Sequence, residues 1–531
     1  MYKSLYHTSL LFVNIYEFIF RKIQVLTIRL NSRIFCGIIY TGLRFYILII
    51  GDDLYMLKTK IVCTLGPASN SPEMIEKMML TGMNVARLNF SHGTHEEHKK
   101  VIDCLKETRE RLGIPCAIML DTKGPEIRLG KFDGGQAELV TDSEFTLVTD
   151  EILGNSERAT VSYKNLPRQI TPGCRILLND GAIELQALEC DEKSIKCTVV
   201  AGGIIKNGKG VNIPNVHLEM PHLSDRDKSD LLFGIENGVD FIAASFMRTG
   251  EDVIGMRKFV DYNGGHDIRI ISKIENLEGI ENFDEILKHS DGIMVARGDM
   301  GVEVDFERLP GLQKKFIKKC YQAGKMVITA TQMLESMIEN PTPTRAEISD
   351  VANAVFDGTS AVMLSGETAA GKYPLRAVKA MARIAEQAEK DAFEGDAYGS
   401  MSYDIDYTDV TNALCDAACT TAADLNAKAI ITLTTTGKSA RRMSKFRPLQ
   451  PIVAATPEHK TFHQLALSWG VYPVLALKQD TTEKLFRHAV DCAKALDLVS
   501  DGDLVVICAG VPVLTPGNTN ILKVQHVEKH Y

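Results

Sequence analysis

The chain has 531 residues, of which 45% are apolar and 24% charged, a composition that is ordinary for a globular protein with several domains. It excludes disordered, collagen-like and many-span membrane proteins. The formal net charge is −8 without a dominant acidic or basic tail, so we expect no nucleic acid and no membrane among the partners. The 12 cysteines are scattered without zinc-site spacing, which favours a reducing compartment and hence a cytoplasmic protein.

Residues 1–55 differ from the rest of the chain, because they are rich in Ile, Leu, Phe, Tyr and Arg and contain neither Pro nor Ala. Their apolar runs are shorter than the roughly 20 residues that cross a bilayer, and no small-residue cleavage site follows them. A second methionine, Met56, stands directly before the first strand-like run. We interpret residues 1–55 as an extension outside the fold, with translation starting at Met56. A transit peptide is the alternative.

From residue 58 onward, short β-branched apolar runs alternate with segments of helical periodicity such as 73–80 and 96–112. Eight of these runs predict strands, at residues 59–65, 84–90, 117–121, 240–245, 269–274, 292–296, 326–330 and 360–364. Near-continuous apolar strands indicate a parallel sheet that is covered on both faces. Eight strand–helix repeats therefore predict an α/β fold, a closed (β/α)8 TIM barrel, which we place at 56–126 and 222–396.

Two further domains are predicted by changes in the pattern. Residues 127–221 interrupt the barrel and contain alternating apolar and polar runs at 144–148 and 194–199, which predict an inserted all-β domain. After residue 396, a helical segment at 412–425 leads to apolar runs at 429–434, 451–455, 471–477 and 503–509. We expect residues 397–531 to form a C-terminal open α/β domain with a regulatory role.

Acids, hydroxyls, a lysine and glycines recur at the ends of all eight predicted barrel strands. The residues at these ends are Gly66 and Pro67; Asn89, Ser91 and His92; Asp121, Thr122 and Lys123; Ser245; Lys273 and Glu275; Arg297, Gly298 and Asp299; Thr331 and Gln332; and Ser365, Gly366 and Glu367. Loops are polar, so packing alone explains any one of these ends but not eight in succession. Because barrel enzymes carry their chemistry at the carboxyl ends of the strands, the pattern predicts an active site there.

Glu275 and Asp299 follow neighbouring strands, and their carboxylates are suited to hold a hard divalent cation together with oxygens of the substrate. Lys273 lies two residues before Glu275 and so points to the same side of the strand end. A lysine beside such a metal site predicts electrostatic stabilisation of a developing negative charge. An ion pair in the barrel interior is the structural alternative.

A second group offers only oxygen atoms and one full negative charge: Asn89, Ser91, Asp121 and Thr122. This set suits a weakly held monovalent cation, and ordinary turn chemistry is the alternative. The chain has no P-loop, because Thr432 stands where the first glycine should be. A nucleotide would therefore be held by loops, backbone groups and Arg or Lys charge.

Seven segments, in the same order along the chain, resemble the pyruvate kinase family: KTKIVCTLGPAS (58–69), NVARLNFSHG (84–93), DTKGPEIR (121–128), ISKIEN (271–276), MVARGD (294–299), TATQMLES (329–336) and MLSGET (363–368). The resemblance runs from Met56 to the C-terminus. It implies a phosphotransferase of glycolysis that moves the phosphoryl group of phosphoenolpyruvate to ADP, giving pyruvate and ATP. We expect the bacterial type of chain, without an additional phosphohistidine-type domain.

The resemblance also implies roles for individual residues. Lys273 would neutralise the transferring phosphoryl group and the forming enolate, Arg87 would contact the phosphoryl group, and Thr331 would lie on the path of proton delivery. The ligand sets would be Glu275 and Asp299 for Mg2+ or Mn2+; Gly298, Asp299 and Thr331 for phosphoenolpyruvate; Asn89, Ser91, Asp121 and Thr122 for K+; and Asn89, Phe90, Ser91, His92, Arg128 and Lys209 for the nucleotide. The inserted domain would carry Lys209 and act as a lid that excludes water.

Three further expectations rest on this resemblance. Glu126 stands where potassium-independent relatives carry Lys, so we expect dependence on K+. The segment of Thr434, Thr435, Thr436, Gly437, Lys438 and Ser439 resembles the family's effector loop, with 517–519 beside it, and suits a sugar-phosphate or nucleotide effector. A plain turn is the alternative, and Thr435 leaves the identity of the effector open. The family implies an allosteric homotetramer.

Two other functions remain as alternatives at this point. One is a different Mg-dependent barrel enzyme that stabilises an enolate, which would not require ADP. The other is a non-catalytic, effector-binding paralogue. Catalytic decay would most simply appear at Lys273 or Asp299, and both residues are present.

Overall fold

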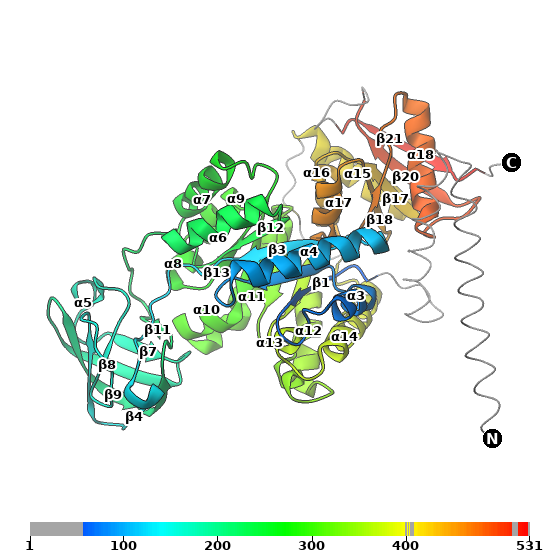
Figure 1. Cartoon of the computed structure of the whole chain (residues 1–531). Coiled ribbons are helices and arrows are strands. Elements are labelled where there is room, and N and C mark those ends of the chain that lie inside the picture. Colours follow the sequence, from blue (N-terminus) through cyan, green and yellow to red (C-terminus); the bar gives the residue numbers. More distant parts are fainter. Residues whose placement is uncertain (1–56, 399–400, 402, 404–407, 512–518, 529–531) are drawn as a thin grey trace, which may run out of the picture.

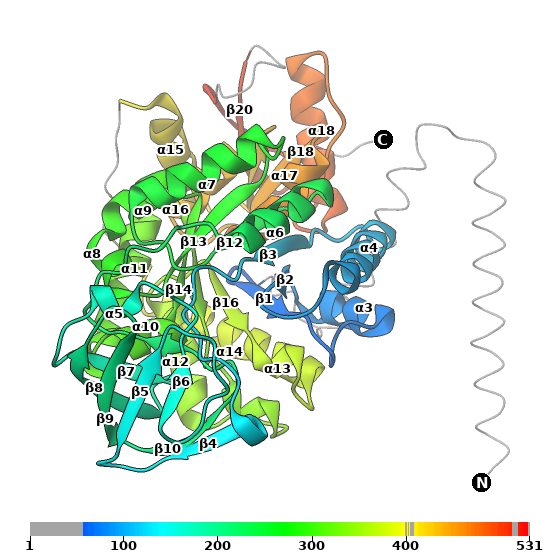
Figure 2. The ribbon, with the colours of Figure 1, turned by 60° about the vertical axis from the view of Figure 1, so that its left-hand side comes forward.

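The computed structural model describes residues 57–398, 401, 403, 408–511 and 519–528. The predicted extension 1–55 and Met56 lie outside the described residues. Figures 1 and 2 show a central barrel with a sheet domain at one end and an α/β domain at the other. This arrangement confirms the predicted fold class, whereas the domain boundaries proposed above remain predictions.

Eight parallel strands close the barrel in the order β1-β16-β15-β14-β13-β12-β3-β2. Their bounds are β1 (Lys60–Thr64), β2 (Val85–Asn89), β3 (Ala117–Asp121), β12 (Phe241–Ala244), β13 (Arg269–Ile274), β14 (Gly292–Ala296), β15 (Met326–Ala330) and β16 (Ala361–Leu364). All eight predicted strands are thus confirmed. They are buried on both faces, as the near-continuous apolar sequence requires.

Helices surround the barrel strands (Figure 2). They are α3 (Pro72–Thr81), α4 (His95–Leu112), α6 (Asp225–Glu236), α7 (Gly250–Tyr262), α8 (Leu277–Glu281), α9 (Phe283–His289), α10 (Arg297–Glu303), α11 (Leu309–Gln322), α12 (Arg345–Phe356), α13 (Gly366–Ala369) and α14 (Pro374–Glu394). The sequence fixes their ends locally. In α4, Thr94 and Glu97 form a capping box, and Gly113 ends the helix with a φ of 65°.

The inserted domain lies between β3 and α6 in the sequence. Its elements are β4 (Gln136–Leu139), β5 (Glu144–Val148), β6 (Arg158–Thr160), α5 (Leu166–Gln169), β7 (Arg175–Leu178), β8 (Ile183–Cys190), β9 (Ser194–Ala201), β10 (Gly203–Lys206) and β11 (Val211–Asn212). Six strands form one sheet in the order β11-β7-β8-β9-β5-β6, and β10 pairs with β4. Alternation along β5 places Phe145 and Leu147 in a separate core, as the pattern predicts.

The C-terminal domain is an open five-stranded sheet in the order β19-β18-β17-β20-β21. Its elements are α15 (Val410–Asp424), β17 (Ala429–Leu433), α16 (Lys438–Lys445), β18 (Ile452–Thr456), α17 (His459–Gln464), β19 (Val471–Leu475), α18 (Thr482–Ala495), β20 (Leu504–Ala509) and β21 (Ile521–His526). The four predicted strands are confirmed. The antiparallel edge strand β21 was not predicted, because none of its residues is fully buried and Lys523 and Gln525 interrupt the apolar run.

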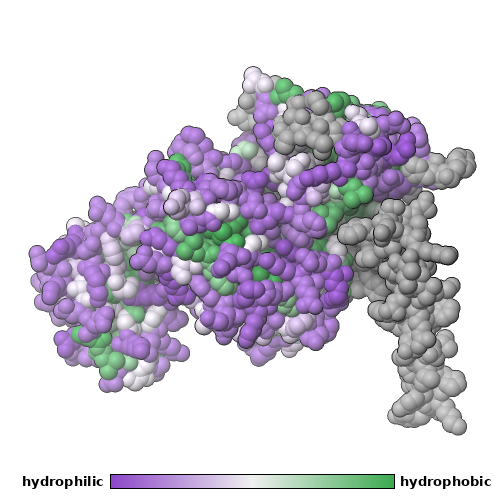
Figure 3. Space-filling view, turned by 45° about the horizontal axis from the view of Figure 1, so that its top comes forward, coloured by the Kyte–Doolittle hydropathy of each residue, from purple (hydrophilic) through white to green (hydrophobic). Residues whose placement is uncertain are grey.

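The molecular surface is mostly hydrophilic in the view of Figure 3. Among the described residues, no helix is both long and apolar enough to cross a membrane. The eleven described cysteines are free thiols.

Candidate active site

Lys273 is the centre of a buried polar network at the carboxyl end of the barrel. Its Nζ lies 3.1 Å from Asp121 Oδ1 and 2.8 Å from Glu275 Oε1, and it donates to Ser245 Oγ over 2.8 Å. Lys273 is 8% exposed and both carboxylates are 1% exposed. Strands β3 and β13 and the end of β12 therefore bring together an ammonium group and two acids that the sequence analysis assigned to one site.

Arg87 joins this network from β2. Its Nε donates to Asp121 Oδ2 over 2.6 Å, and its Nη1 donates to Thr64 Oγ1 over 2.9 Å. Among the described residues, its Nη2 has no hydrogen-bond partner. The guanidinium group is thus fixed by two bonds and keeps one nitrogen for a further acceptor.

Burial and neighbouring charges shift the pKa values of Lys273 and of its two carboxylate partners, Asp121 and Glu275. Burial alone would raise the pKa of Asp121, but Arg87 and Lys273 lower it below its ordinary value. Burial opposes the charged form of Lys273, but Asp121 and Glu275 outweigh it and raise the pKa of Lys273. Burial raises the pKa of Glu275 to about 7, with Asp299 adding to the rise against the opposing effect of Lys273. The region near Glu275 and Asp299 therefore has an excess of negative charge that a cation would relieve.

Gly298 and Thr331 meet at the ends of neighbouring strands. The Gly298 amide donates to Thr331 Oγ1 over 2.8 Å. Thr331 has a φ of 69°, a left-handed conformation that is costly for a β-branched residue. Arg297 donates from Nε to the Ala330 carbonyl over 3.2 Å and from Nη2 to the Thr331 carbonyl over 2.5 Å, and so holds this turn. Gly298 and Asp299, expected in a loop, lie in the first turn of α10.

A cleft of about 350 Å³ separates the mouth of the barrel from the inserted domain. Its lining includes His92, Arg128, Lys209 and Asp299, so four predicted site residues from four different segments face one space. Arg128 Nη1 donates to the Gly208 carbonyl over 2.8 Å, which ties the base of the inserted domain to the segment that carries Lys209.

Glu126 lies on the wall of the same cleft. Its Oε2 accepts a hydrogen bond of 2.7 Å from Arg128 Nε. Phe90, in contrast, points away from the cleft. Its ring is 2% exposed and stacks on His98 with 4.0 Å between the ring centroids. Its backbone amide donates to the Asp121 carbonyl over 3.0 Å and its carbonyl accepts from Arg226 Nη2 over 2.8 Å, so Phe90 offers no unpaired group to a nucleotide in this structure.

The oxygen-rich group spans two adjacent strands, because Asn89 and Asp121 are partners in the register of β2 and β3. Asn89 Oδ1 accepts from the Ser91 amide over 3.1 Å, which curls the chain after β2 so that the two side chains stay together. Thr122 is buried and its amide donates to the Ala243 carbonyl over 3.0 Å. All four residues offer oxygen ligands, the chemistry that an alkali cation requires.

The segment 434–439 forms the turn between β17 and α16, far from the barrel mouth (Figure 1). The Gly437 amide donates to Thr434 Oγ1 over 2.9 Å, and Gly437 has a φ of 77°. Ser439 Oγ and Thr519 Oγ1 lie 2.5 Å apart, so one end of the expected partner segment is adjacent to the turn. Thr435 and Thr436 are exposed, whereas residues 517 and 518 lie outside the described residues.

Ser245 and Arg297 were not assigned to the site from the sequence, although both stood among the polar strand ends. Ser245 Oγ lies 3.3 Å from Asp121 Oδ1 and 2.8 Å from Lys273 Nζ. A serine at a strand end is too common to be informative alone, and its contacts follow from the position of β12 between β13 and β3 in the sheet. Arg297 donates to the backbone carbonyl of Thr331, and a side-chain bond to the backbone leaves no recognisable pattern in the sequence.

Comparison with known proteins decides the family. Residues 56–378 match the family described as "Pyruvate kinase, barrel domain", and residues 412–525 match "Pyruvate kinase, alpha/beta domain". The chain belongs to the pyruvate kinase family. It is 48% identical to a pyruvate kinase of Clostridium acetobutylicum over 478 residues, which cover 89% of this chain and 100% of that protein. It is 49% identical to the Geobacillus stearothermophilus pyruvate kinase, over 88% of this chain and 80% of that protein.

A solved structure agrees with this assignment. The crystal structure of a pyruvate kinase from Cryptosporidium parvum superposes with a TM-score of 0.82 at 40% sequence identity, over 92% of this chain and 97% of that one. The activity of the chain is that of a pyruvate kinase, a phosphotransferase. The resemblance seen in the sequence motifs is thereby confirmed.

Proposed function

We propose that the chain transfers the phosphoryl group of phosphoenolpyruvate to ADP at the carboxyl end of its barrel, with Lys273 as the central catalytic residue. The bond between phosphorus and the enol oxygen breaks, a bond from phosphorus to a β-phosphate oxygen of ADP forms, and the enolate takes up a proton to give pyruvate. The observation that carries this proposal is the buried position of Lys273 Nζ between Asp121 and Glu275, below the cleft that Lys209 lines.

Lys273 supplies a fixed positive charge where negative charge develops. Its ammonium group is held by three contacts and is shielded from water, so it interacts strongly with charge that forms nearby and needs no reorganisation. Arg87 adds a second charge, since its Nη2 can donate to a phosphoryl oxygen while Nε and Nη1 keep the guanidinium in place. Both groups act by positioning and charge neutralisation, which is what phosphoryl transfer requires.

Thr331 and Gly298 lie together at the position where the enolate would be protonated. The Thr331 hydroxyl accepts from the Gly298 amide over 2.8 Å and donates to the Ala330 carbonyl over 2.6 Å. We assign Thr331 to the path of proton delivery and Gly298 and Asp299 to the binding of phosphoenolpyruvate. The left-handed backbone at Thr331 is consistent with this role, because strained residues persist where the surrounding structure enforces them.

Glu275 and Asp299 fit a divalent cation, Mg2+ or Mn2+. No cluster of three or more His, Cys, Asp or Glu residues suited to a metal occurs in the part of the chain that the structure describes, so such an ion would take its other ligands from substrate oxygens and water. Burial is the main cause of the raised pKa of Glu275, and the charge of Asp299 adds to it against the opposing effect of Lys273. When bound, the divalent ion supplies neutralisation of charge on the phosphoryl oxygens.

A monovalent cation, K+, is assigned to the oxygens of Asn89, Ser91, Asp121 and Thr122, which lie on adjacent strands. Glu126 is paired with Arg128 and brings no ammonium group that could replace this cation. We therefore expect K+ dependence, with the cation adding positive charge beside the phosphoryl group.

The nucleotide is assigned to the cleft below the inserted domain, with its phosphates near the backbone of residues 89–92 and the side chains of Arg128 and Lys209. The domain is tied to the barrel mouth by a 3.0 Å bond from Asn212 Nδ2 to Glu303 Oε1. Closure around the nucleotide would exclude water, which otherwise accepts the phosphoryl group. The inserted domain would thus act as a lid.

We also propose how the chain is regulated and how it assembles. The turn at 434–439 exposes threonine hydroxyls and Lys438, which suits a sugar-phosphate or nucleotide effector. A homotetramer agrees with the family. A cytoplasmic location agrees with the lack of disulfides among the described cysteines.

The direct test is pyruvate formation by the full-length chain from phosphoenolpyruvate, ADP and Mg2+, with and without K+. We expect turnover that requires ADP and that falls strongly when Na+ replaces K+. Turnover without ADP would indicate a different enolate-forming reaction, and no turnover from folded protein would favour the effector-binding paralogue. Turnover that is indifferent to K+ would leave the reaction in place but contradict the assignment of Asn89, Ser91, Asp121 and Thr122.

A further inference from the structure

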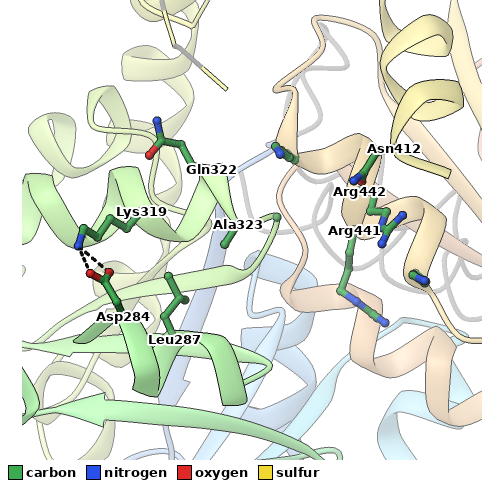
Figure 4. Close-up of a pocket in the computed structure, with 11 residues that line it drawn as sticks. Asp284, Leu287, Lys319, Gln322, Ala323, Asn412, Arg441 and Arg442 are labelled. Atoms are coloured by element: carbon green, nitrogen blue, oxygen red, sulfur yellow. Dashed lines mark hydrogen bonds and ion pairs between the residues drawn. The ribbon is translucent and has the colours of Figure 1, made fainter. Parts of the chain in front are cut away.

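The guanidinium group of Arg87 is held at two of its three nitrogen atoms by the strands on either side of β2. Nε donates to Asp121 Oδ2 of β3 over 2.6 Å, and Nη1 donates to Thr64 Oγ1 of β1 over 2.9 Å. Arg442, in the cleft of about 470 Å³ that Figure 4 shows, has among the described residues one such anchor, Asp409 Oδ1 at 2.6 Å from its Nη1. A second anchor at a second nitrogen fixes the plane of the group, so Arg87 points in one direction.

The Thr64 hydroxyl can only accept from Arg87, because its own proton is used elsewhere. It donates to the Leu364 carbonyl of β16 over 3.0 Å. A hydroxyl group has one proton and two lone pairs, so only lone pairs remain on the side of Arg87. Thr64 and Arg87 are partners in the register of β1 and β2, which places their side chains on the same face of the sheet. The bond between them is therefore set by the strand pairing and not by a loop.

Thr64 is itself held in place. Its carbonyl accepts from Thr368 Oγ1 over 2.8 Å, which ties the end of β1 to helix α13. Thr64 is 4% exposed and Arg87 is 9% exposed, so water has little access to replace the hydroxyl as an acceptor. A β-branched side chain also has few χ1 rotamers. Thr64 therefore presents its hydroxyl oxygen at a fixed position.

We propose that Thr64 is a positioning residue, whose hydroxyl aims Arg87 Nη2 at the phosphoryl group of phosphoenolpyruvate. The inference rests on the function proposed for Arg87, since Thr64 would act through Arg87 and through no contact of its own with the substrate. Thr64 does not line the cleft in which the substrates are placed. Among the described residues, Arg87 Nη2 has no hydrogen-bond partner, so it is the nitrogen that remains for a phosphoryl oxygen.

The two anchors of Arg87 differ in what else they contact. Asp121 Oδ1 also lies 3.1 Å from Lys273 Nζ and 3.3 Å from Ser245 Oγ, and Asp121 belongs to the proposed K+ site. A substitution of Asp121 would therefore disturb several groups at once. Without the Thr64 hydroxyl, Nη1 would be a buried donor without an acceptor, and the guanidinium group could turn about its remaining bond to Asp121. Thr64 is thus the position at which the orientation of Arg87 can be tested alone.

Steady-state kinetics on the full-length chain, at saturating Mg2+ and K+, tests the proposal. Thr64→Val keeps the shape of the side chain and removes the hydroxyl, so we expect kcat/KM for phosphoenolpyruvate to fall by about tenfold or more. Thr64→Ser keeps the hydroxyl and should stay within about threefold of wild type. The KM for ADP should change in neither variant. Thr432→Val is the matched control and should match wild type, because the buried Thr432 hydroxyl of β17 has no hydrogen-bond partner among the described residues.

Calorimetry on the same variants adds a readout that a packing defect would not produce. Phosphoenolpyruvate should bind about tenfold more weakly to Thr64→Val than to wild type, because the oriented donor to its phosphoryl group is lost. Pyruvate has no phosphoryl group, so it should bind to Thr64→Val as it binds to wild type.

The outcomes separate this inference from the proposed function. No turnover of phosphoenolpyruvate with ADP by the wild type, or full activity in Arg87→Met, would contradict the proposed function itself. If the wild type is active and Arg87→Met is impaired, wild-type kinetics in Thr64→Val overturn the inference. So does an equal loss in Thr64→Ser, or an equal loss in the binding of phosphoenolpyruvate and pyruvate, since either would indicate a packing defect only. If Thr64→Val does not fold, Thr64→Ala removes the same hydroxyl from a smaller side chain, and the same loss is expected.

Discussion

The two ends of the barrel both bury charged side chains, but they differ in what covers them, which is the inserted domain and its cleft at the carboxyl end and the C-terminal domain at the amino end. At the carboxyl end, Lys273 lies between Asp121 and Glu275 and the cleft of the inserted domain begins above them. At the amino end, Arg109 Nη1 pairs with Asp240 Oδ2 over 2.8 Å. This pair is 7% and 0% exposed.

The C-terminal domain covers the amino end of the barrel. Lys460 Nζ donates to the Gly238 carbonyl over 3.1 Å, and Gln464 Nε2 donates to the Asp240 carbonyl over 3.1 Å. Both come from α17, so a second domain completes the hydrogen bonds of the strand ends. The comparison shows that charge type alone does not identify an active site. Catalytic and structural ion pairs contain the same types of residue. They differ in whether the surrounding groups leave charge unbalanced next to a cleft.

The largest expected effect is that of Lys273→Ala on turnover. Removing the fixed ammonium group takes away charge stabilisation in the transition state, and we expect kcat to fall by about 10³- to 10⁵-fold. The KM for phosphoenolpyruvate should change little, because Arg87 and Gly298 remain. Steady-state kinetics on folded protein measures both values. Lys288→Ala, an exposed lysine on α9, is the control and should keep full activity. Unchanged turnover in Lys273→Ala would refute the assignment.

A substitution at the amino end of the barrel should have the opposite pattern of effects, lowering the stability without lowering turnover. Arg109→Met removes the closest ion pair of the buried Asp240, which keeps a 2.8 Å bond from the Ile118 amide and Lys460 Nζ at 3.8 Å, and we expect the free energy of unfolding to fall by about 3 kcal/mol. The kcat per folded molecule should stay the same, since no atom of this pair reaches the cleft. Urea unfolding and kinetics on one preparation give both numbers. In Arg111→Met, on the same helix, only an exposed pair with Glu76 is lost, and the cost should be about 1 kcal/mol or less.

Glu126→Lys addresses the proposed monovalent cation at the carboxyl end. An ammonium group at this position would stand in for K+, so the dependence of kcat on K+ should drop by about tenfold, equivalent to about 1.4 kcal/mol. The variant also breaks the 2.7 Å pair of Glu126 with Arg128, and Glu126→Gln controls for that loss. We expect Glu126→Gln to keep the K+ requirement. Full K+ dependence in Glu126→Lys would be incompatible with the role given to this residue.

Most of the fold could be predicted from the sequence, because each barrel strand is buried on both faces and reads as an apolar run. The seven motifs placed Lys273, Glu275 and Asp299 at strand ends, where the structure brings the first two into contact. The edge strand β21 could not be predicted, since an edge strand lacks the burial that produces a pattern. Contacts such as that of Ser245 with Lys273 were equally inaccessible, because the sequence predicts that the two strands are neighbours but not which side chains meet at their ends.

The most gradual expected effect concerns the pH dependence of stability at the amino end, through His463 on α17. His463 is 5% exposed and its Nδ1 has no hydrogen-bond partner among the described residues. Burial, followed by the charge of Arg109, lowers the pKa of His463 to about 3. The unfolded chain binds this proton near pH 6.5, so between pH 6.5 and 3 it holds one proton more than the folded protein. The contribution of neutral His463 is therefore complete above pH 6.5 and is lost as the pH falls.

Replacement by a side chain that does not titrate should remove this dependence. Relative to wild type, His463→Gln should gain stability on acidification by up to about 1.4 kcal/mol per pH unit, whatever its stability at neutral pH. Urea unfolding at pH 7, 6 and 5 provides the difference between the two proteins, in which other titrating groups cancel. His266→Gln, at an exposed position, should run parallel to wild type. Parallel curves for His463→Gln would mean that this histidine is protonated or solvated in the folded protein. The amino end would then lack the dry, fully covered character that distinguishes it from the catalytic end.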